Sequence, residues 1–103
     1  MWNSTLLDVR GRLIKTITVS KGSLHACPVE PRDVMREAIR ANAYGLVLAH
    51  CHPSGSADPS DSDVQLTERL RAAGELVGIR VHDHIVIAAD AYFSFVEAGR
   101  WRR

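Results

Sequence analysis

A short apolar run near the middle of the chain, Leu46-Val47-Leu48-Ala49, constrains the fold more than any other stretch. Consecutive apolar residues that follow a helical pattern are typical of a strand buried on both faces of a sheet. Such strands lie at the centre of α/β domains, and sites are commonly built at their ends. His50 stands at the end of this run. The stretch therefore predicts a fold class and also the place where a site should lie.

Two helical patterns flank this run. Pro31 opens the first, because proline at the first helical position loses no hydrogen bond, and Gly45 is expected to end it. The second is expected to run from about Ser60 to about Val77, with Gly78 as its stop. Residues at helical spacing that should face the core are Val34, Met35, Ala38, Ile39 and Asn42 in the first helix and Leu66, Leu70, Ala73 and Val77 in the second.

The remaining patterns are those of β-strands. An alternating, β-branched stretch follows the turn signal Arg10-Gly11, which predicts an N-terminal hairpin. The predicted strands and short segments are residues 5–9, 12–19, 24–27, 81–88 and 92–96. The order of elements predicts a single α/β domain over residues 1–103, with a mixed β-sheet flanked by helices.

Composition narrows the classes of function. The net charge of +1 gives no overall field that would attract nucleic acid or a membrane surface. No apolar run is long enough to span a bilayer, and no recognised nucleic-acid-binding motif occurs. Cys27 and Cys51 do not make a disulfide framework, which indicates a reducing compartment. We therefore expect a cytoplasmic protein without a nucleic-acid or membrane partner.

Metal-ligating side chains gather directly after the apolar run. His50 and His52 are two residues apart, so in an extended segment both point to one side and Cys51 to the other. Asp63 begins the second helix, from where its carboxylate can point back toward the strand end. Two imidazoles and one carboxylate are a ligand set that catalytic zinc uses while one position stays open for water.

Ser60 admits two interpretations. Ser-x-x-Asp before a helix is a capping box, in which Ser60 accepts from backbone N–H groups and Asp63 is only a good N3 residue. Alternatively, the Ser60 hydroxyl hydrogen-bonds a zinc-bound water or an oxyanion. The two interpretations are compatible, because a capped helix start also holds the Asp63 carboxylate rigidly.

These residues resemble the signature of a known family. His50-x-His52-Pro53-Ser54-Gly55, followed by Pro59-Ser60-x-x-Asp63, is similar to the H-x-H-P and S-x-x-D motif of JAMM (JAB1/MPN) metalloproteases, in particular their bacterial RadC-type branch. Further similar segments occur in order along the chain: Leu7-Asp8, Gly22-Ser23-Leu24, Pro31-Arg32-Asp33, Arg36-Glu37-Ala38, Asn42-Ala43, Leu48-Ala49-His50, Thr67, Asp83-His84-Ile85 and Ser94-Phe95.

The resemblance implies a fold, a cofactor and a reaction. The fold would be cytidine-deaminase-like, and Zn²⁺ would be bound by His50, His52 and Asp63. Ser60 would help to stabilise a tetrahedral intermediate. The substrate would be a protein whose peptide or isopeptide bond is hydrolysed.

Two departures from the family pattern bear on activity. Cys51 stands where the family usually has asparagine; a thiolate ligand would close the site, but strand alternation disfavours it. The general-base glutamate of the family lies at the start of the first strand, upstream of Leu7-Asp8, and residues 1–3 supply no carboxylate. Larger members also carry an N-terminal helical module that is absent here. We therefore expect a truncated chain or a short paralogue whose metal site lacks its usual base.

His82-Asp83-His84 looks like a second metal cluster. His82 and His84 are expected to share one face of the last long strand, with Asp83 on the other. Because Asp83-His84 belongs to the resemblance, we expect it to support the ligands rather than to bind a separate ion.

Three classes of function follow. The first is a zinc-dependent hydrolase of the JAMM type. The second is a protein-interaction module whose metal site lacks turnover; an accessory role in DNA repair belongs with this class, although no residue supports it. The third, zinc-dependent deamination, is disfavoured because it needs an H-x-E and a C-x-x-C pair, and neither occurs.

Overall fold

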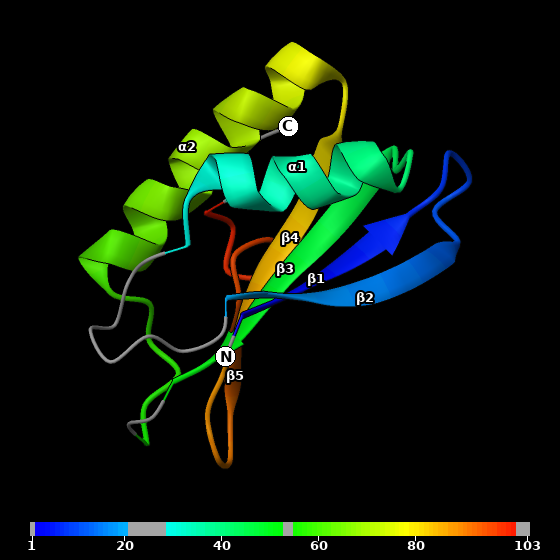
Figure 1. Ribbon diagram of the computed structural model, residues 1–103. Coiled ribbons are helices and arrows are strands. Elements are labelled where there is room, and N and C mark those ends of the chain that lie inside the picture. Colours follow the sequence, from blue (N-terminus) through cyan, green and yellow to red (C-terminus); the bar gives the residue numbers. More distant parts are fainter. Residues whose placement is uncertain (1, 21–28, 53–54, 101–103) are drawn as a thin grey trace.

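The computed structural model of the chain describes residues 2–20, 29–52 and 55–100, which form a five-stranded mixed sheet and two helices (Figure 1). The strand order is β2-β1-β3-β4-β5. β3 and β4 run parallel, and the other neighbouring pairs are antiparallel. The elements are β1 (Trp2–Leu7), β2 (Leu13–Ser20), α1 (Pro31–Arg40), β3 (Gly45–Cys51), α2 (Asp61–Val77), β4 (Arg80–Ile87) and β5 (Tyr92–Ser94). The predicted α/β class is confirmed; the strand predicted at 24–27 lies outside the described residues.

The N-terminal hairpin begins and turns earlier than predicted. Strand β1 starts at Trp2, and Asp8 already belongs to the turn, where its Oδ1 accepts from the backbone N–H groups of Arg10 and Arg12 at 2.9 Å each. Aspartate favours turns because its side chain can satisfy nearby backbone donors in this way. Val9, predicted as the last residue of the strand, is therefore 72% exposed in the turn.

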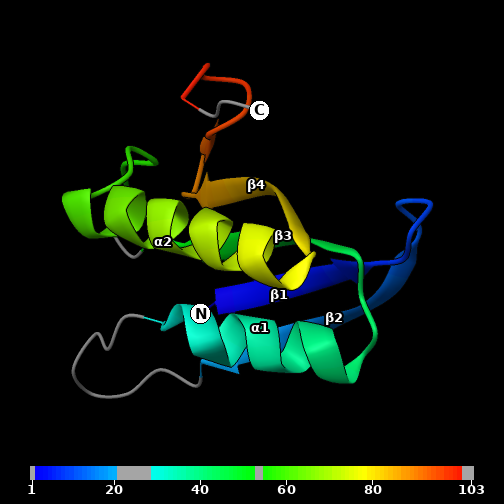
Figure 2. The ribbon, with the colours of Figure 1, turned by 90° about the horizontal axis from the view of Figure 1, so that it is seen from above.

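Both helices cover the same face of the sheet (Figure 2), and they contact each other there. They share one hydrophobic core with the inward side chains of β1, β3 and β4. Its buried members include Leu6, Val34, Ala38, Leu46, Leu48, Leu66, Leu70 and Val81. On the other face of β3, Val47 and Ala49 are only half-buried. The prediction of a strand buried on both faces is wrong for that side, because no described helix covers it. Neither helix combines the length and apolar composition needed to cross a membrane.

Helix α1 ends at Arg40, five residues before the predicted Gly45. Asn42 adopts a left-handed conformation with φ of 56°, and the Ala43 N–H donates to the Ala38 carbonyl at 2.9 Å. Asparagine tolerates this conformation, which commonly ends helices. Asn42, beyond the helix end, and Ile39, still within α1, are both exposed, so their predicted place on the inner face is wrong. Val77, at the end of α2, is about half exposed, so its predicted place on the inner face is wrong as well.

Helix α2 and β4 join in close contact through glycines. Gly78 ends α2 in the left-handed conformation, φ 77°, as predicted. A Cβ at Gly74 would lie 2.3 Å from the carbonyl oxygen of Ile79, so only glycine fits this approach of the chain to the helix. The end of α2 therefore packs directly against the chain that leads into β4.

Asp83 ties the C-terminal segment to β4. Its Oδ1 accepts from the N–H groups of His84 at 2.7 Å and Val96 at 3.2 Å, and its Oδ2 accepts from the Ser94 hydroxyl at 2.5 Å. Phe95 is held between these contacts, and its ring stacks on the His84 ring with centroids 5.0 Å apart.

Candidate metal centre

The cluster forms where β3 ends and α2 begins. His50 is the last residue but one of strand β3, His52 follows the strand, and Asp63 is the third residue of α2. The Ser60 N–H donates to Asp63 Oδ2 at 2.8 Å, and the Asp63 N–H donates to Ser60 Oγ at 3.1 Å. The predicted capping box is thus confirmed, and it fixes the Asp63 carboxylate toward the strand end.

The three predicted ligands converge. His50 Nε2 lies 3.4 Å from Asp63 Oδ1, and His52 Nε2 lies 3.2 Å from Asp63 Oδ2. One ligand atom from each residue falls within 4.8 Å of the others. Two ligands about 2 Å from a tetrahedral zinc ion are separated by roughly 3.3 Å. The three side chains therefore fit a metal ion in both chemistry and spacing.

Each ring nitrogen of His52 faces an acceptor, although a neutral ring has only one N–H to donate. Its Nδ1 lies 3.2 Å from the Ser56 carbonyl oxygen, and its Nε2 faces the Asp63 carboxylate. Both neighbours are acceptors, and a neutral imidazole carries a single N–H. A metal ion would resolve the conflict, because the Nδ1–H would donate to the Ser56 carbonyl and the Nε2 lone pair would bind the ion.

Burial sets the charge states of the cluster. It lowers the pKa of His50 to about 4, although the Asp63 charge acts in the opposite direction. Burial alone would raise the pKa of Asp63, but the Ser60 hydrogen bonds and the nearby histidines outweigh it and lower that pKa. Near neutral pH the pair is a neutral imidazole beside a carboxylate. Metals bind these forms, because ligands must be deprotonated.

Trp2 is a neighbour of the site that sequence reasoning missed. It pairs with His50 across β1 and β3, and its ring stacks on the His50 ring with centroids 3.8 Å apart and planes 15° apart. Nothing in the local sequence indicates which residue of β3 Trp2 faces. Cys51 is exposed and is not among the clustered ligands, as strand alternation predicted.

His82 and His84 lie on different faces of β4, contrary to the prediction. A bulge between Val81 and Asp83 inserts His82, whose ring packs where a Cβ of Gly45 would be. His84 instead pairs with Leu48, three residues along β3 and therefore on the other face. Within the described residues, the only group of three or more metal-ligating side chains is His50, His52 and Asp63.

His84 contacts one of the three clustered ligands, in line with the supporting role that the resemblance implied. Its Nε2 lies 3.1 Å from His50 Nδ1, and its Nδ1 lies 2.6 Å from Thr67 Oγ1. Burial, followed by the nearby His50, lowers the pKa of His84 to about 4. The resemblance includes Thr67 but gives it no role. Its contact with β4 depends on how α2 packs, which the sequence does not show.

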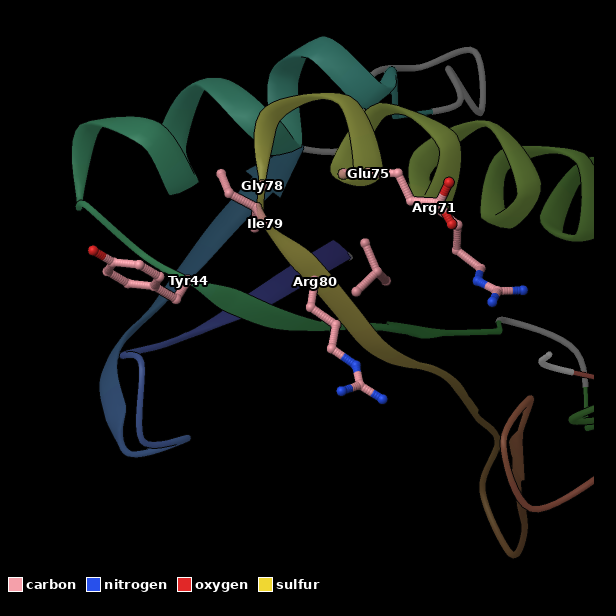
Figure 3. A pocket seen from close by; sticks show the side chains of 8 residues that line it. Tyr44, Arg71, Glu75, Gly78, Ile79 and Arg80 are labelled. Atoms are coloured by element: carbon pink, nitrogen blue, oxygen red, sulfur yellow. The ribbon is translucent and has the colours of Figure 1, made fainter. Parts of the chain in front are cut away.

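A pocket of about 550 Å³ lies at the opposite end of the β3–β4 pair (Figure 3). Its lining includes Tyr44, Arg71, Glu75 and Arg80, which are charged or aromatic side chains at or near the surface. None of the predicted site residues lines it. The pocket is thus separate from the metal-ligating cluster.

Comparisons with known proteins agree with the geometry. A family model described as the RadC-like JAB domain matches residues 3–100. A UPF0758 protein of Actinobacillus succinogenes is 52% identical over 91 residues, covering 88% of this chain. UPF0758 proteins of Geotalea uraniireducens and Trichlorobacter lovleyi are 45% and 48% identical over 94 residues, covering 91% of it. The chain spans about two fifths of the length of these relatives, 41% in each case.

Proposed function

The chain belongs to the RadC-like JAB domain family, and on that premise we propose that it is a zinc-dependent hydrolase domain acting on a peptide or isopeptide bond. The observation that carries the proposal is the convergence of two imidazole Nε2 atoms and one carboxylate at the end of β3. Neutral nitrogen ligands with a single carboxylate favour zinc over the oxygen-seeking ions magnesium and calcium.

Three protein ligands leave room for chemistry. A zinc ion held by His50, His52 and Asp63 would lower the pKa of a water molecule and polarise a substrate carbonyl. The chain's contribution is to hold the three ligands rigidly: β3 carries His50, and the capped start of α2 carries Asp63. Burial of the His50 and Asp63 side chains, 6% and 7% exposed, keeps competing water away from these ligands.

Ser60 is proposed to stabilise the developing oxyanion. Its Oγ accepts from the Asp63 N–H, which leaves the hydroxyl hydrogen to donate. The residue is exposed, so a substrate carbonyl can reach it. A single donor of this kind typically contributes about 10²–10³ in kcat.

A second candidate function is a protein-interaction module that binds zinc without turnover. The observation that favours it is on β1, where the family's base would be expected: Trp2–Leu7 contains no carboxylate, and Trp2 covers the His50 ring. A hydrolase needs a group that accepts the proton of the attacking water. An added glutamate just upstream of Met1 should create activity if that group is what is missing.

The test separates metal binding from turnover. Zinc content is measured on dialysed wild-type protein and on His50→Ala and His52→Ala, with His82→Ala as the control histidine at the far end of β4. Hydrolysis is measured on peptide and isopeptide substrates with the same samples. We expect one zinc per chain in wild type and His82→Ala, and none in the other two. Stoichiometric zinc without hydrolysis would favour the interaction module, and wild type without zinc would refute both functions.

A further inference from the structure

We propose that Thr67 and His84 are positioning residues for the metal centre: they hold the His50 ring with its proton on Nδ1, which leaves the Nε2 lone pair facing the metal position. The inference rests on the proposed function, because it concerns the same ligand. The three side chains come from α2, β4 and β3 and form a line of hydrogen bonds behind the cluster.

The line starts inside α2. Thr67 Oγ1 donates to the carbonyl oxygen of Asp63, one turn earlier, at 2.8 Å. A hydroxyl has one hydrogen, and this contact uses it. Thr67 Oγ1 must therefore accept in its other contact, at 2.6 Å from His84 Nδ1. The proton between these two residues belongs to His84.

The position of the His84 proton then determines which ring donates in the His84–His50 hydrogen bond. His84 is fully buried, and a neutral imidazole with its proton on Nδ1 has only an acceptor at Nε2. That Nε2 lies 3.1 Å from His50 Nδ1, so His50 is the donor. Its own proton is thereby held on Nδ1, and its Nε2 presents a lone pair toward Asp63. Histidine ligands of metals usually have their other ring N–H fixed by such a partner.

The distances disfavour the opposite direction. Reversed protons would place an N–H on His50 Nε2, facing Asp63 Oδ1 at 3.4 Å. Hydrogen bonds from charged or neutral donors to a carboxylate are usually shorter, about 2.7–2.9 Å when charge-assisted. The reversed line would also leave the 2.8 Å contact of Thr67 with the Asp63 carbonyl without a proton.

The surroundings keep this line away from water. The Phe95 ring stacks on His84, and Asp83 holds Phe95 there through its contacts with Ser94 and Val96. The Trp2 ring stacks on His50. His84 is 0% exposed and Thr67 is 3% exposed, so water cannot replace Thr67 Oγ1 as the partner of the His84 Nδ1–H. This dependence makes the proton arrangement sensitive to the Thr67 hydroxyl.

The experiment reads the ring protons directly. Long-range ¹H–¹⁵N correlation spectra of the metal-free protein show which nitrogen of each histidine carries the proton. We expect Nδ1–H for both His50 and His84 in wild type. Thr67→Val keeps the shape but removes the acceptor of the His84 Nδ1–H. The His84 proton should move to Nε2, and the His50 proton should then move to its own Nε2.

Zinc affinity, measured by competition with a chelator of known affinity, gives the second readout. Thr67→Val should bind zinc about 10- to 100-fold more weakly than wild type. Thr67→Ser restores the hydroxyl and should recover both the His50 tautomer and the affinity. Thr16→Val is the matched control, because Thr16 is an exposed residue of β2. It should change neither readout.

Two results would overturn the inference. One is a His50 proton on Nε2 in the metal-free wild type, a reading that requires no variant to fold. The other is a folded Thr67→Val protein with an unchanged tautomer and unchanged zinc affinity. Failure of the proposed function looks different: a wild-type protein with the His50 proton on Nδ1 that binds no zinc would leave the hydrogen-bond line standing and refute the metal site.

Discussion

The two ends of the β3–β4 strand pair contrast sharply in how they handle polar groups. Where β3 ends, His50 and Asp63 are buried, and their acceptor atoms face one another. Where β3 begins, Arg80 and Glu75 are exposed around an open pocket (Figure 3). Buried acceptors need a proton or a cation, whereas exposed charges are satisfied by water. The metal centre is therefore expected at the closed end and not in the open pocket.

The ends differ in packing as well. Gly45 and Gly74 lie at the pocket end, each in contact with atoms that a Cβ would strike. At the cluster end the close contacts are hydrogen bonds and stacked rings. The comparison predicts that substitutions at the pocket end cost folding stability and spare metal binding. Substitutions at the cluster end should weaken metal binding and have a smaller effect on folding stability.

Asp63→Asn tests the cluster end with the largest expected effect. The change keeps the side-chain shape but removes the charge that attracts the ion and one of its acceptor oxygens. We expect zinc affinity to fall by about 100-fold or more, roughly 3 kcal/mol or above. Asp61→Asn, an exposed change in the same first turn of α2, should leave the affinity close to wild type. Equal affinities for the two variants would contradict the assignment of Asp63 as a ligand.

Lowering the pH should reduce the free energy of unfolding of the metal-free protein, because buried histidines at the cluster end must be protonated. Burial lowers the pKa of His50 and of His84 to about 4 from an ordinary value of 6.5. Between these values the unfolded chain binds more protons than the folded chain, so the free energy of unfolding falls as pH falls from about 6.5 to about 4. The loss should be on the order of a few kcal/mol by urea unfolding. His50→Gln should weaken the dependence, and a flat profile would show that these rings are not held neutral.

Gly74→Ala tests the pocket end. The added Cβ would lie 2.3 Å from the Ile79 carbonyl oxygen, which is backbone and cannot swing away. We expect a loss of about 1–3 kcal/mol in the free energy of unfolding, measured with urea, and zinc stoichiometry like that of wild type. Gly55→Ala is the control, since nothing lies within 4 Å of its added carbon. A Gly74→Ala protein as stable as this control would mean that α2 and β4 are not as close as described.

Gly45→Ala should have the smallest effect. Its Cβ would meet the His82 ring at 2.5 Å, and a side chain can move where a carbonyl cannot. The expected loss is about 1 kcal/mol of unfolding free energy. Adding His82→Ala should recover most of it, because the nearest clash partner is gone and only the Arg80 carbonyl oxygen, 3.2 Å from the added carbon, remains close. If the double variant is no more stable than Gly45→Ala alone, then His82 is not the residue that requires glycine there.

The sequence predicted most reliably what depends on neighbouring residues. The capping box at Ser60 and the stop at Gly78 are local backbone chemistry, and both were confirmed. The His50, His52 and Asp63 set was also predictable, because spacing on a strand and a fixed helix start bring the three together.

The sequence failed to predict contacts that depend on strand register and on how the helices pack against the sheet. The facing of Trp2 and His50 depends on how β1 pairs with β3, which no local pattern reveals. The bulge that separates His82 from His84 changes the face of one residue, because a shift by one position reverses a strand's pattern. The Thr67–His84 contact joins an α2 residue to β4 across the core and needs the assembled fold.

The most direct test is a crystal structure of the zinc-loaded protein with anomalous diffraction collected at the zinc edge. We predict one strong peak per chain, bounded by the Nε2 atoms of His50 and His52 and the carboxylate of Asp63 at about 2.0–2.2 Å. A peak at Cys51 or His82, or no peak between these three side chains, would contradict the account.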